Sequence, residues 1–227
     1  YDQLDTNKVV RLCMSENSID TKQYSPKNFR AHISNLKNNM TTPGEAIENA
    51  ESFYDVKVAE VFSSYEKKLI MANALDFDDL LIKTVDLLQT NESILKFWSN
   101  KFQFIMVDEY QDTNLVQYKL VELLASNNKN VCVVGDSDQS IYAFRGADIR
   151  NILEFEKDFE DAKIIQLDKN YRSTKKILNL ANTIISNNDR KIDKNLWTDN
   201  QEGDEISSIK FTSEKDEARW IAEEIKN

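Results

Sequence analysis

The sequence has one histidine, two cysteines and no long apolar run. His32 has no companion at metal-ligand spacing, so a histidine-based metal site or catalytic triad is not expected. Cys13 and Cys132 stand in unlike contexts, which favours reduced, buried thiols in a cytosolic protein. No stretch approaches the roughly 18 apolar residues of a membrane helix, and no segment resembles a signal peptide. We therefore expect a cytoplasmic protein.

The composition is that of a soluble globular chain, with 41% hydrophobic and 30% charged residues in 227. This length suits one large domain or two smaller ones. The net charge of −10 argues against a protein whose whole surface grips DNA, but it leaves room for a local basic groove. A solvated helix face or phosphate binding would equally explain the basic bias within 169–194. The basic residues there are Lys169, Arg172, Lys175, Lys176, Arg190, Lys191 and Lys194.

Two short apolar runs each lead directly into acidic residues. The run 103–107 precedes Asp108 and Glu109, and the run 131–135 precedes Asp136. Continuous apolar runs of this length suit strands buried in a parallel sheet. Such sheets bind ligands at the carboxyl ends of their strands, where these acids would emerge. Two such strands separated by a helical segment predict a nucleotide site.

The first 74 residues read as mainly helical. Two Ser/Thr-Pro pairs predict helix starts, and Thr42 with Glu45 fits a capping box. The pairs are Ser25-Pro26 and Thr42-Pro43, and an apolar stripe follows at Val58, Phe62, Tyr65 and Leu69. Leu75 to Leu81 then opens another helix that carries three acids near its positive end. Those acids suit a helix terminus, with metal binding as the alternative.

From residue 102 the pattern alternates between strands and helices, which predicts a parallel α/β architecture. We expect strands near 103–107, 131–135, 163–167 and 205–211. We expect helices near 114–126, 149–159, 174–187 and 214–227, with Ser173 and Ser213 as N-caps. The polar stretch 187–204 reads as a loop.

An acid pair at a strand end suits nucleoside-triphosphate hydrolysis. The first acid can hold Mg²⁺ while the second polarises the attacking water. Alone, this pattern also fits a surface turn, but its continuation is more specific. The run Val107 to Asn114 resembles the Walker B motif of the UvrD/PcrA/Rep family of superfamily-one DNA helicases. The runs Val134 to Asp148 and Leu167 to Thr174 resemble the third and fourth motifs of that family, and Leu75 to Leu81 resembles a segment preceding Walker B.

The resemblance implies roles in binding and hydrolysing ATP. Asp108, with Glu109 beside it, would hold Mg²⁺, and Glu109 would be the catalytic base. Gln139 would contact the γ-phosphate or the attacking water. Tyr171 would stack on adenine, and Arg172 would reach the γ-phosphate as an arginine finger. Tyr171 could instead pack under its helix, and Arg172 could cap a helix or pair with an acid.

The resemblance also implies a contact with single-stranded DNA. Tyr142 and Phe144 would stack on bases, and Arg145 would lie beside the strand. Both aromatic residues could instead belong to the core. The family often has arginine where Ala143 stands and tryptophan where Phe144 stands, so this chain would offer less stacking area and one cationic contact fewer.

None of the four glycines belongs to a G-x-x-x-x-G-K-[ST] phosphate-binding loop. We therefore expect an internal fragment of a helicase that alone neither hydrolyses ATP nor unwinds DNA. The missing strand would leave a sheet edge open to self-association.

The fold class that the resemblance implies is α/β, a partial RecA-like P-loop NTPase motor domain with a helical insertion. Residues 1–74 would be the insertion, 75–170 the later portion of the first motor domain and 171–227 the start of the second. The parent would be an ATP-dependent 3′–5′ DNA helicase using ATP and Mg²⁺ on single-stranded or junction DNA, with repair or replication proteins as possible partners. The alternatives are the helicase subunit of a recombination nuclease complex and a degenerate DNA- or protein-binding adaptor.

Overall fold

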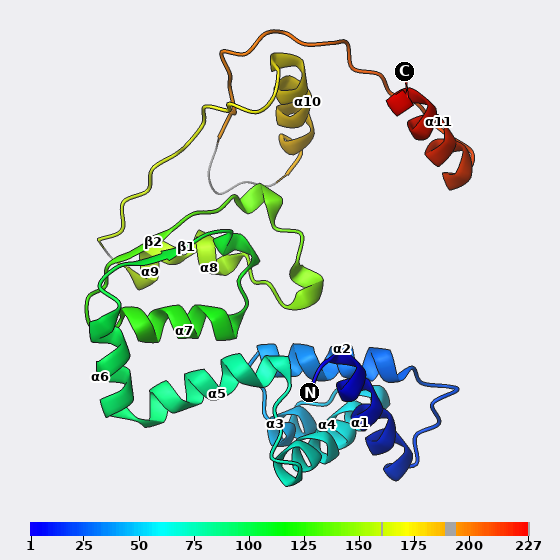
Figure 1. Ribbon diagram of the computed structural model, residues 1–227, viewed down its shortest axis with the longest axis vertical. Coiled ribbons are helices and arrows are strands. Elements are labelled where there is room, and N and C mark those ends of the chain that lie inside the picture. Colours follow the sequence, from blue (N-terminus) through cyan, green and yellow to red (C-terminus); the bar gives the residue numbers. More distant parts are fainter. Residues whose placement is uncertain (160, 189–193, 227) are drawn as a thin grey trace. The chain divides into compact units, whose positions relative to one another are not determined.

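The computed structural model describes the whole chain except Glu160, residues 189–193 and Asn227, and it leaves out the Arg145 side chain. The chain forms two compact units, Tyr1–Ala162 and Lys163–Asn227. Figure 1 shows the elements of each unit coloured along the sequence. Within the described residues, no helix has the length and apolar character that crossing a membrane requires.

Four helices build the N-terminal portion of the first unit. They are α1 (Gln3–Glu16), α2 (Pro26–Asn38), α3 (Pro43–Glu48) and α4 (Phe53–Met71). The starts of α2 and α3 are confirmed, because Ser25 and Thr42 are their N-caps with proline at the first turn. The predicted capping box of Thr42 and Glu45 is also present, although the Ser25 side chain makes no capping hydrogen bond.

The main apolar core lies among these helices. The predicted stripe of α4 is confirmed, since Val58, Phe62, Tyr65 and Leu69 are all buried. They pack in one cluster with residues of α1 to α3, including Val10, Cys13, Met14, Phe29, Ile33 and Ala46. The helical portion of the chain therefore has a core of its own.

A small parallel sheet follows two more helices, α5 (Phe77–Thr90) and α6 (Glu92–Lys101). Strands β1 (Ile105–Val107) and β2 (Val131–Val133) pair in parallel, with Ile105 opposite Val131 and Val107 opposite Val133. Helix α7 (Leu115–Ala125) connects them (Figure 1). This confirms the predicted α/β class with a parallel sheet.

The expectation that the two strands are buried in the sheet is wrong for one face, because both strands are exposed there. Met106 and Cys132, which are opposite each other in the register, are both exposed, while their neighbours along each strand are partly buried. The expectation that both cysteines are buried is therefore wrong for Cys132 and right for Cys13. Alternate residues of a strand point to opposite faces, and in the described chain only one face is covered.

Short helical turns follow each strand. These are η1 (Tyr110–Asp112), η2 (Ser137–Gln139) and η3 (Ala143–Arg145), and α8 (Arg150–Leu153) and α9 (Phe155–Asp158) come next. The single helix expected near 149–159 is thus two, because Glu154 leaves the helical region with φ −115° and ψ 8°.

The second unit contains α10 (Lys175–Ile185) and α11 (Glu214–Lys226). The strands expected at 163–167 and 205–211 are wrong: the described portion of this unit has only an isolated parallel bridge between Lys169 and Trp197. A strand needs a neighbour to satisfy its backbone groups, and neither segment finds one there. Ser213 accepts a hydrogen bond from the Asp216 amide, as a cap should, whereas Thr174 and not Ser173 is the N-cap of α10. The expected loop 187–204 lies partly outside the described residues.

Candidate functional site

The predicted acid pair lies at the end of β1. Asp108 and Glu109 are both exposed, and the Asp108 carboxylate accepts a hydrogen bond of 2.9 Å from the Glu109 amide. Glu109 has left-handed backbone angles, φ 50° and ψ 41°. This conformation is uncommon outside glycine and costs about 1–3 kcal/mol, which the surrounding contacts must offset.

A buried glutamine joins the ends of the two strands. Gln111, in η1, donates from Nε2 to Glu109 Oε2 at 2.8 Å and accepts at Oε1 from the Asp136 amide at 3.0 Å. The side chain is almost fully buried, and both of its polar atoms are bonded. The two acidic strand ends are thus held together by one amide.

Gly135 makes this approach possible. A Cβ atom at Gly135 would overlap Gln111 Oε1 and would lie 2.7 Å from Ile152 Cδ1 and 3.2 Å from the Tyr110 amide nitrogen. Any other residue at position 135 would therefore displace the Gln111 amide or the backbone beside it.

Gln139 joins the same network through Asp136. The Asp136 carboxylate accepts from the Asp138 amide and from Gln139 Nε2, both at 2.9 Å. Three of the predicted site residues, Asp108, Glu109 and Gln139, are therefore brought to one edge of the sheet. Gln111 and Asp136 carry the links; Asp136 was expected only as an acid at a strand end, and Gln111 was given no role of its own. The acid after the second apolar run was a signal for Asp136, but nothing in the sequence marks the buried amide.

Of the predicted DNA-contacting aromatic residues, Tyr142 directly precedes η3 and Phe144 lies within it. The Tyr142 and Phe144 rings lie 5.8 Å apart between centroids, inclined by 34°, and the Phe144 side chain is 77% exposed. Gly146 ends the turn with φ 84°, and a Cβ atom there would lie within 4 Å of the α2 residues Asn35 and Asn38. Because its side chain is so exposed, Phe144 is not a core aromatic residue. The Arg145 side chain lies outside what the structure describes.

Tyr171 and Arg172 belong to the second unit. The Tyr171 ring is 79% exposed and lies 5.4 Å from the Lys169 ammonium group, so it does not pack under its helix. Arg172 is exposed, and its amide donates to Asn170 Oδ1 at 2.9 Å.

Acidic residues of the same unit neutralise much of the basic stretch. Lys169 pairs with Asp199, Lys175 with Glu202, and Lys176 with Glu205. This pairing favours a solvated, charge-balanced face over phosphate binding for these lysines. Arg190 and Lys191 lie outside the described residues.

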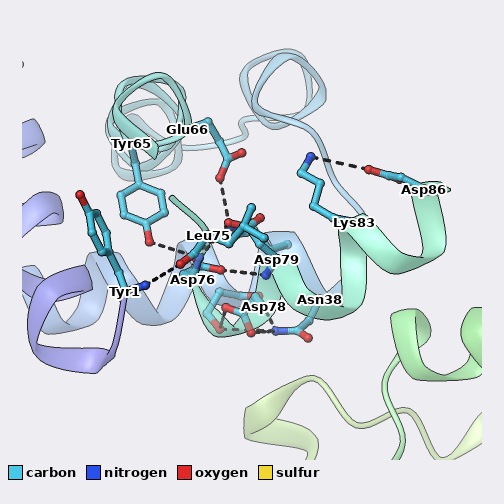
Figure 2. A network of polar contacts seen from close by, with 12 residues as sticks. Tyr1, Asn38, Tyr65, Glu66, Leu75, Asp76, Asp78, Asp79, Lys83 and Asp86 are labelled. Carbon is cyan, nitrogen blue, oxygen red and sulfur yellow. Dashed lines mark hydrogen bonds and ion pairs between the residues drawn. The ribbon is translucent and has the colours of Figure 1, made fainter. Parts of the chain in front are cut away.

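The acids that open α5 take part in a buried ionic network. Asp76 is the N-cap of α5 and forms a capping box with Asp79, which confirms the helix-terminus interpretation. Lys37 of α2 is buried with its ammonium group 2.8 Å from a carboxylate oxygen of each, and 3.0 Å from Glu66. Figure 2 shows Tyr65 and Glu66 of α4 gathered above these acids, and the Tyr65 hydroxyl donates to Asp76 at 2.8 Å.

The network changes the pKa values of its members. Burial alone would lower the pKa of Lys37, but the surrounding carboxylates, Asp76 foremost, raise it above its ordinary value. Burial likewise opposes ionisation of Asp76, yet Lys37 holds the pKa of Asp76 below its ordinary value. Burial, reinforced by the Asp76 charge, raises the pKa of Tyr65 well above its usual range. No sequence pattern indicated that Lys37 is buried.

Asn38, next to Lys37, links the helical portion to the start of α7. Its amide donates to Asp78 at 3.0 Å, and its carbonyl oxygen accepts from Asn114, the N-cap of α7, at 2.7 Å. The helical portion thereby contacts the element that follows the acid pair.

The donor set at the sheet edge fits Mg²⁺ but not a cation held by protein ligands alone. Among the described residues there is no group of three or more His, Cys, Asp or Glu side chains that could hold a metal ion. Mg²⁺ keeps several waters and binds through one or two carboxylates together with substrate phosphates, so an exposed Asp108 suits it.

The chain is similar to known proteins over nearly its whole length. Residues 1–160 match the UvrD/REP helicase N-terminal domain, and residues 165–227 match the UvrD-like helicase C-terminal domain. The chain is 49% identical to the ATP-dependent DNA helicases PcrA of Staphylococcus aureus and Staphylococcus epidermidis, over 99% of its own length and 31% of theirs. It therefore spans about a third of these relatives. Because the two family matches follow in order along the chain and the relatives are 49% identical to it, the chain belongs to the UvrD/Rep family of helicases.

Proposed function

We propose that this chain is a segment of an ATP-dependent DNA helicase that moves 3′ to 5′ along single-stranded DNA. The observation that carries the proposal is the gathering of Asp108, Glu109 and Gln139 at one edge of the sheet. The names of the PcrA relatives support it. The helical residues 1–74 would be an insertion in the first motor domain, residues 75–170 the later portion of that domain, and residues 171–227 the start of the second motor domain.

The sheet edge would be the hydrolytic site. When bound, Mg²⁺-ATP supplies the phosphoryl group and much of the charge neutralisation. Asp108 would hold Mg²⁺, with Glu109 beside it. The Glu109 carboxylate would take the proton of the attacking water, and the Gln139 amide would orient that water or contact the γ-phosphate.

The second unit would complete the site. Tyr171 presents an exposed ring for stacking on adenine, and Arg172 would place its charge on the γ-phosphate, where it stabilises a loose transition state. Closure of the two motor domains around ATP would let Tyr171 and Arg172 contact the nucleotide.

The exposed turn at η3 would contact DNA. Tyr142 and Phe144 offer ring faces to single-stranded bases, an interaction that tolerates any base sequence, and Arg145 would lie beside the strand. Hydrolysis would then drive stepping of bases across the two rings. With DNA as its partner, the protein would act in the cytoplasm, where repair or replication proteins could load it.

DNA-stimulated ATP hydrolysis tests this function in a polypeptide that carries this chain together with a P-loop. We expect Glu109→Gln to lower stimulated hydrolysis by about 10²- to 10⁴-fold, the usual contribution of a general base, while DNA binding persists. Glu92→Gln, at the exposed start of α6, is the matched control and should leave activity intact. Full activity in Glu109→Gln would rule out the hydrolytic role of Glu109. A parent polypeptide without ATPase activity would favour the alternative of a degenerate DNA- or protein-binding adaptor.

A further inference from the structure

Gln111 is a buried polar side chain beside the proposed hydrolytic site. It is 1% exposed, and each polar atom of its amide meets a different strand end. A buried amide is tolerated only when its hydrogen bonds are made. The orientation of this amide is fixed by its partners, because the Asp136 N–H can only donate and the Glu109 carboxylate needs a donor.

The Glu109 carboxylate depends on this contact. In the portion of the chain that the structure describes, no other side chain is hydrogen-bonded to it. Glu109 is exposed, so packing restricts its side chain little. One hydrogen bond of 2.8 Å therefore sets where the proposed base points.

The other end of the amide reaches Gln139. Gln111 Oε1 accepts from the Asp136 amide, and the Asp136 carboxylate accepts from Gln139 Nε2. A continuous series of hydrogen bonds therefore runs from the proposed base to the side chain proposed to contact the γ-phosphate. Gly135 keeps the space into which the Gln111 oxygen fits.

We propose that Gln111 is a positioning residue, which aims the Glu109 carboxylate at the attacking water and fixes it relative to Gln139. The inference rests on the proposed function, since it assumes that Glu109 is the base. Only an amide satisfies both partners, because a glutamate could accept from Asp136 but could not donate to Glu109, and a methionine fills the space without either bond.

The test measures DNA-stimulated ATP hydrolysis in the polypeptide that carries this chain and a P-loop. We expect Gln111→Met to lower kcat on the order of 10- to 100-fold, as small misplacements of a reacting group do. The KM for ATP should hardly change, because the amide touches no portion of the nucleotide in this proposal. Gln89→Met, at an exposed position of α5, is the matched control.

A double-mutant cycle separates positioning from a structural role. If Gln111 acts through Glu109, then Gln111→Met causes no further loss in the Glu109→Gln background. An equal loss in both backgrounds would overturn the proposal, and so would a Gln111→Met variant with unchanged kcat. Should Gln111→Met fail to fold, Gln111→Glu decides instead, since it keeps the size and the bond to the Asp136 amide; unchanged kcat there would overturn the proposal.

The same data distinguish the proposed function from the positioning role. Unimpaired hydrolysis in Glu109→Gln would remove the proposed function and the inference with it. A strong loss in Glu109→Gln with wild-type kcat in both Gln111 variants would leave the function standing and overturn the inference alone.

Discussion

The ammonium group of Lys37 lies 2.8 Å from the Asp76 carboxylate, with both side chains almost fully buried. The two residues belong to different elements, since Lys37 is near the end of α2 and Asp76 caps the start of α5. Asp79 and Glu66 also contact the same ammonium group. One buried cation therefore contacts three carboxylates where the helical core meets α5.

Removing this cation should destabilise the protein strongly. We expect Lys37→Met to lower the free energy of unfolding by about 3–5 kcal/mol, because it leaves buried carboxylates without a cationic partner. Lys8→Met is the control, since the ion pair of Lys8 with Asp5 is exposed and should matter little. Urea unfolding measures both. A Lys37→Met protein as stable as the control would contradict the view that the ion pair holds α2 to α5.

The Asp76 carboxylate should make the free energy of unfolding depend on pH in the acidic range. Its pKa is lower in the folded than in the unfolded protein, so its contribution is present above the unfolded value of about 3.9 and is lost as pH falls through the folded value. The stability difference between the wild type and Asp76→Asn should therefore shrink below about pH 4. Urea unfolding at a series of pH values measures it, and a difference that stays constant would refute the linkage.

Lys37 contributes at the opposite end of the pH scale. Its pKa is raised in the folded state, so its contribution is complete below the unfolded value of about 10.4 and is lost only above it. The ion pair should thus be fully formed at neutral pH.

The exposed ring of Phe144 should carry a share of the affinity for single-stranded DNA. We expect Phe144→Ala to weaken binding of an oligothymidine by about 1–3 kcal/mol per stacked base. Fluorescence anisotropy in the polypeptide with the P-loop, without nucleotide, measures the affinity. Phe97→Ala, another exposed phenylalanine on α6, should bind like the wild type. Equal affinity in all three proteins would mean that DNA does not stack at η3.

A polypeptide of these 227 residues alone should not hydrolyse ATP, because it contains no phosphate-binding loop. It should also self-associate, since both β1 and β2 have an edge without a partner strand in the described chain. Sedimentation velocity over a range of concentrations measures association. A monomer at every concentration would contradict the expected self-association. Phosphate release by the isolated chain would contradict the expected lack of ATP hydrolysis.

Local signals in the sequence predicted the elements of the fold that local interactions determine. Apolar runs ending in acids predicted the parallel strands before Asp108 and Asp136, and Ser/Thr-Pro pairs predicted two helix starts. The strands expected at 163–167 and 205–211 are absent because a strand depends on a partner that the run itself does not reveal. Lys37 and Gln111 were missed for a related reason: burial of a polar side chain depends on partners distant in sequence.

The uncovered face of the two strands has a chemical consequence. Cys132 is exposed there, whereas Cys13 is enclosed in the helical core, where burial raises the pKa of its thiol to about 11. A thiol reacts through its thiolate, so an alkylating reagent distinguishes the two. The rate at which a reagent alkylates Cys132 in a longer polypeptide would therefore show whether another segment covers that face. A covered Cys132 should react more slowly than an exposed one.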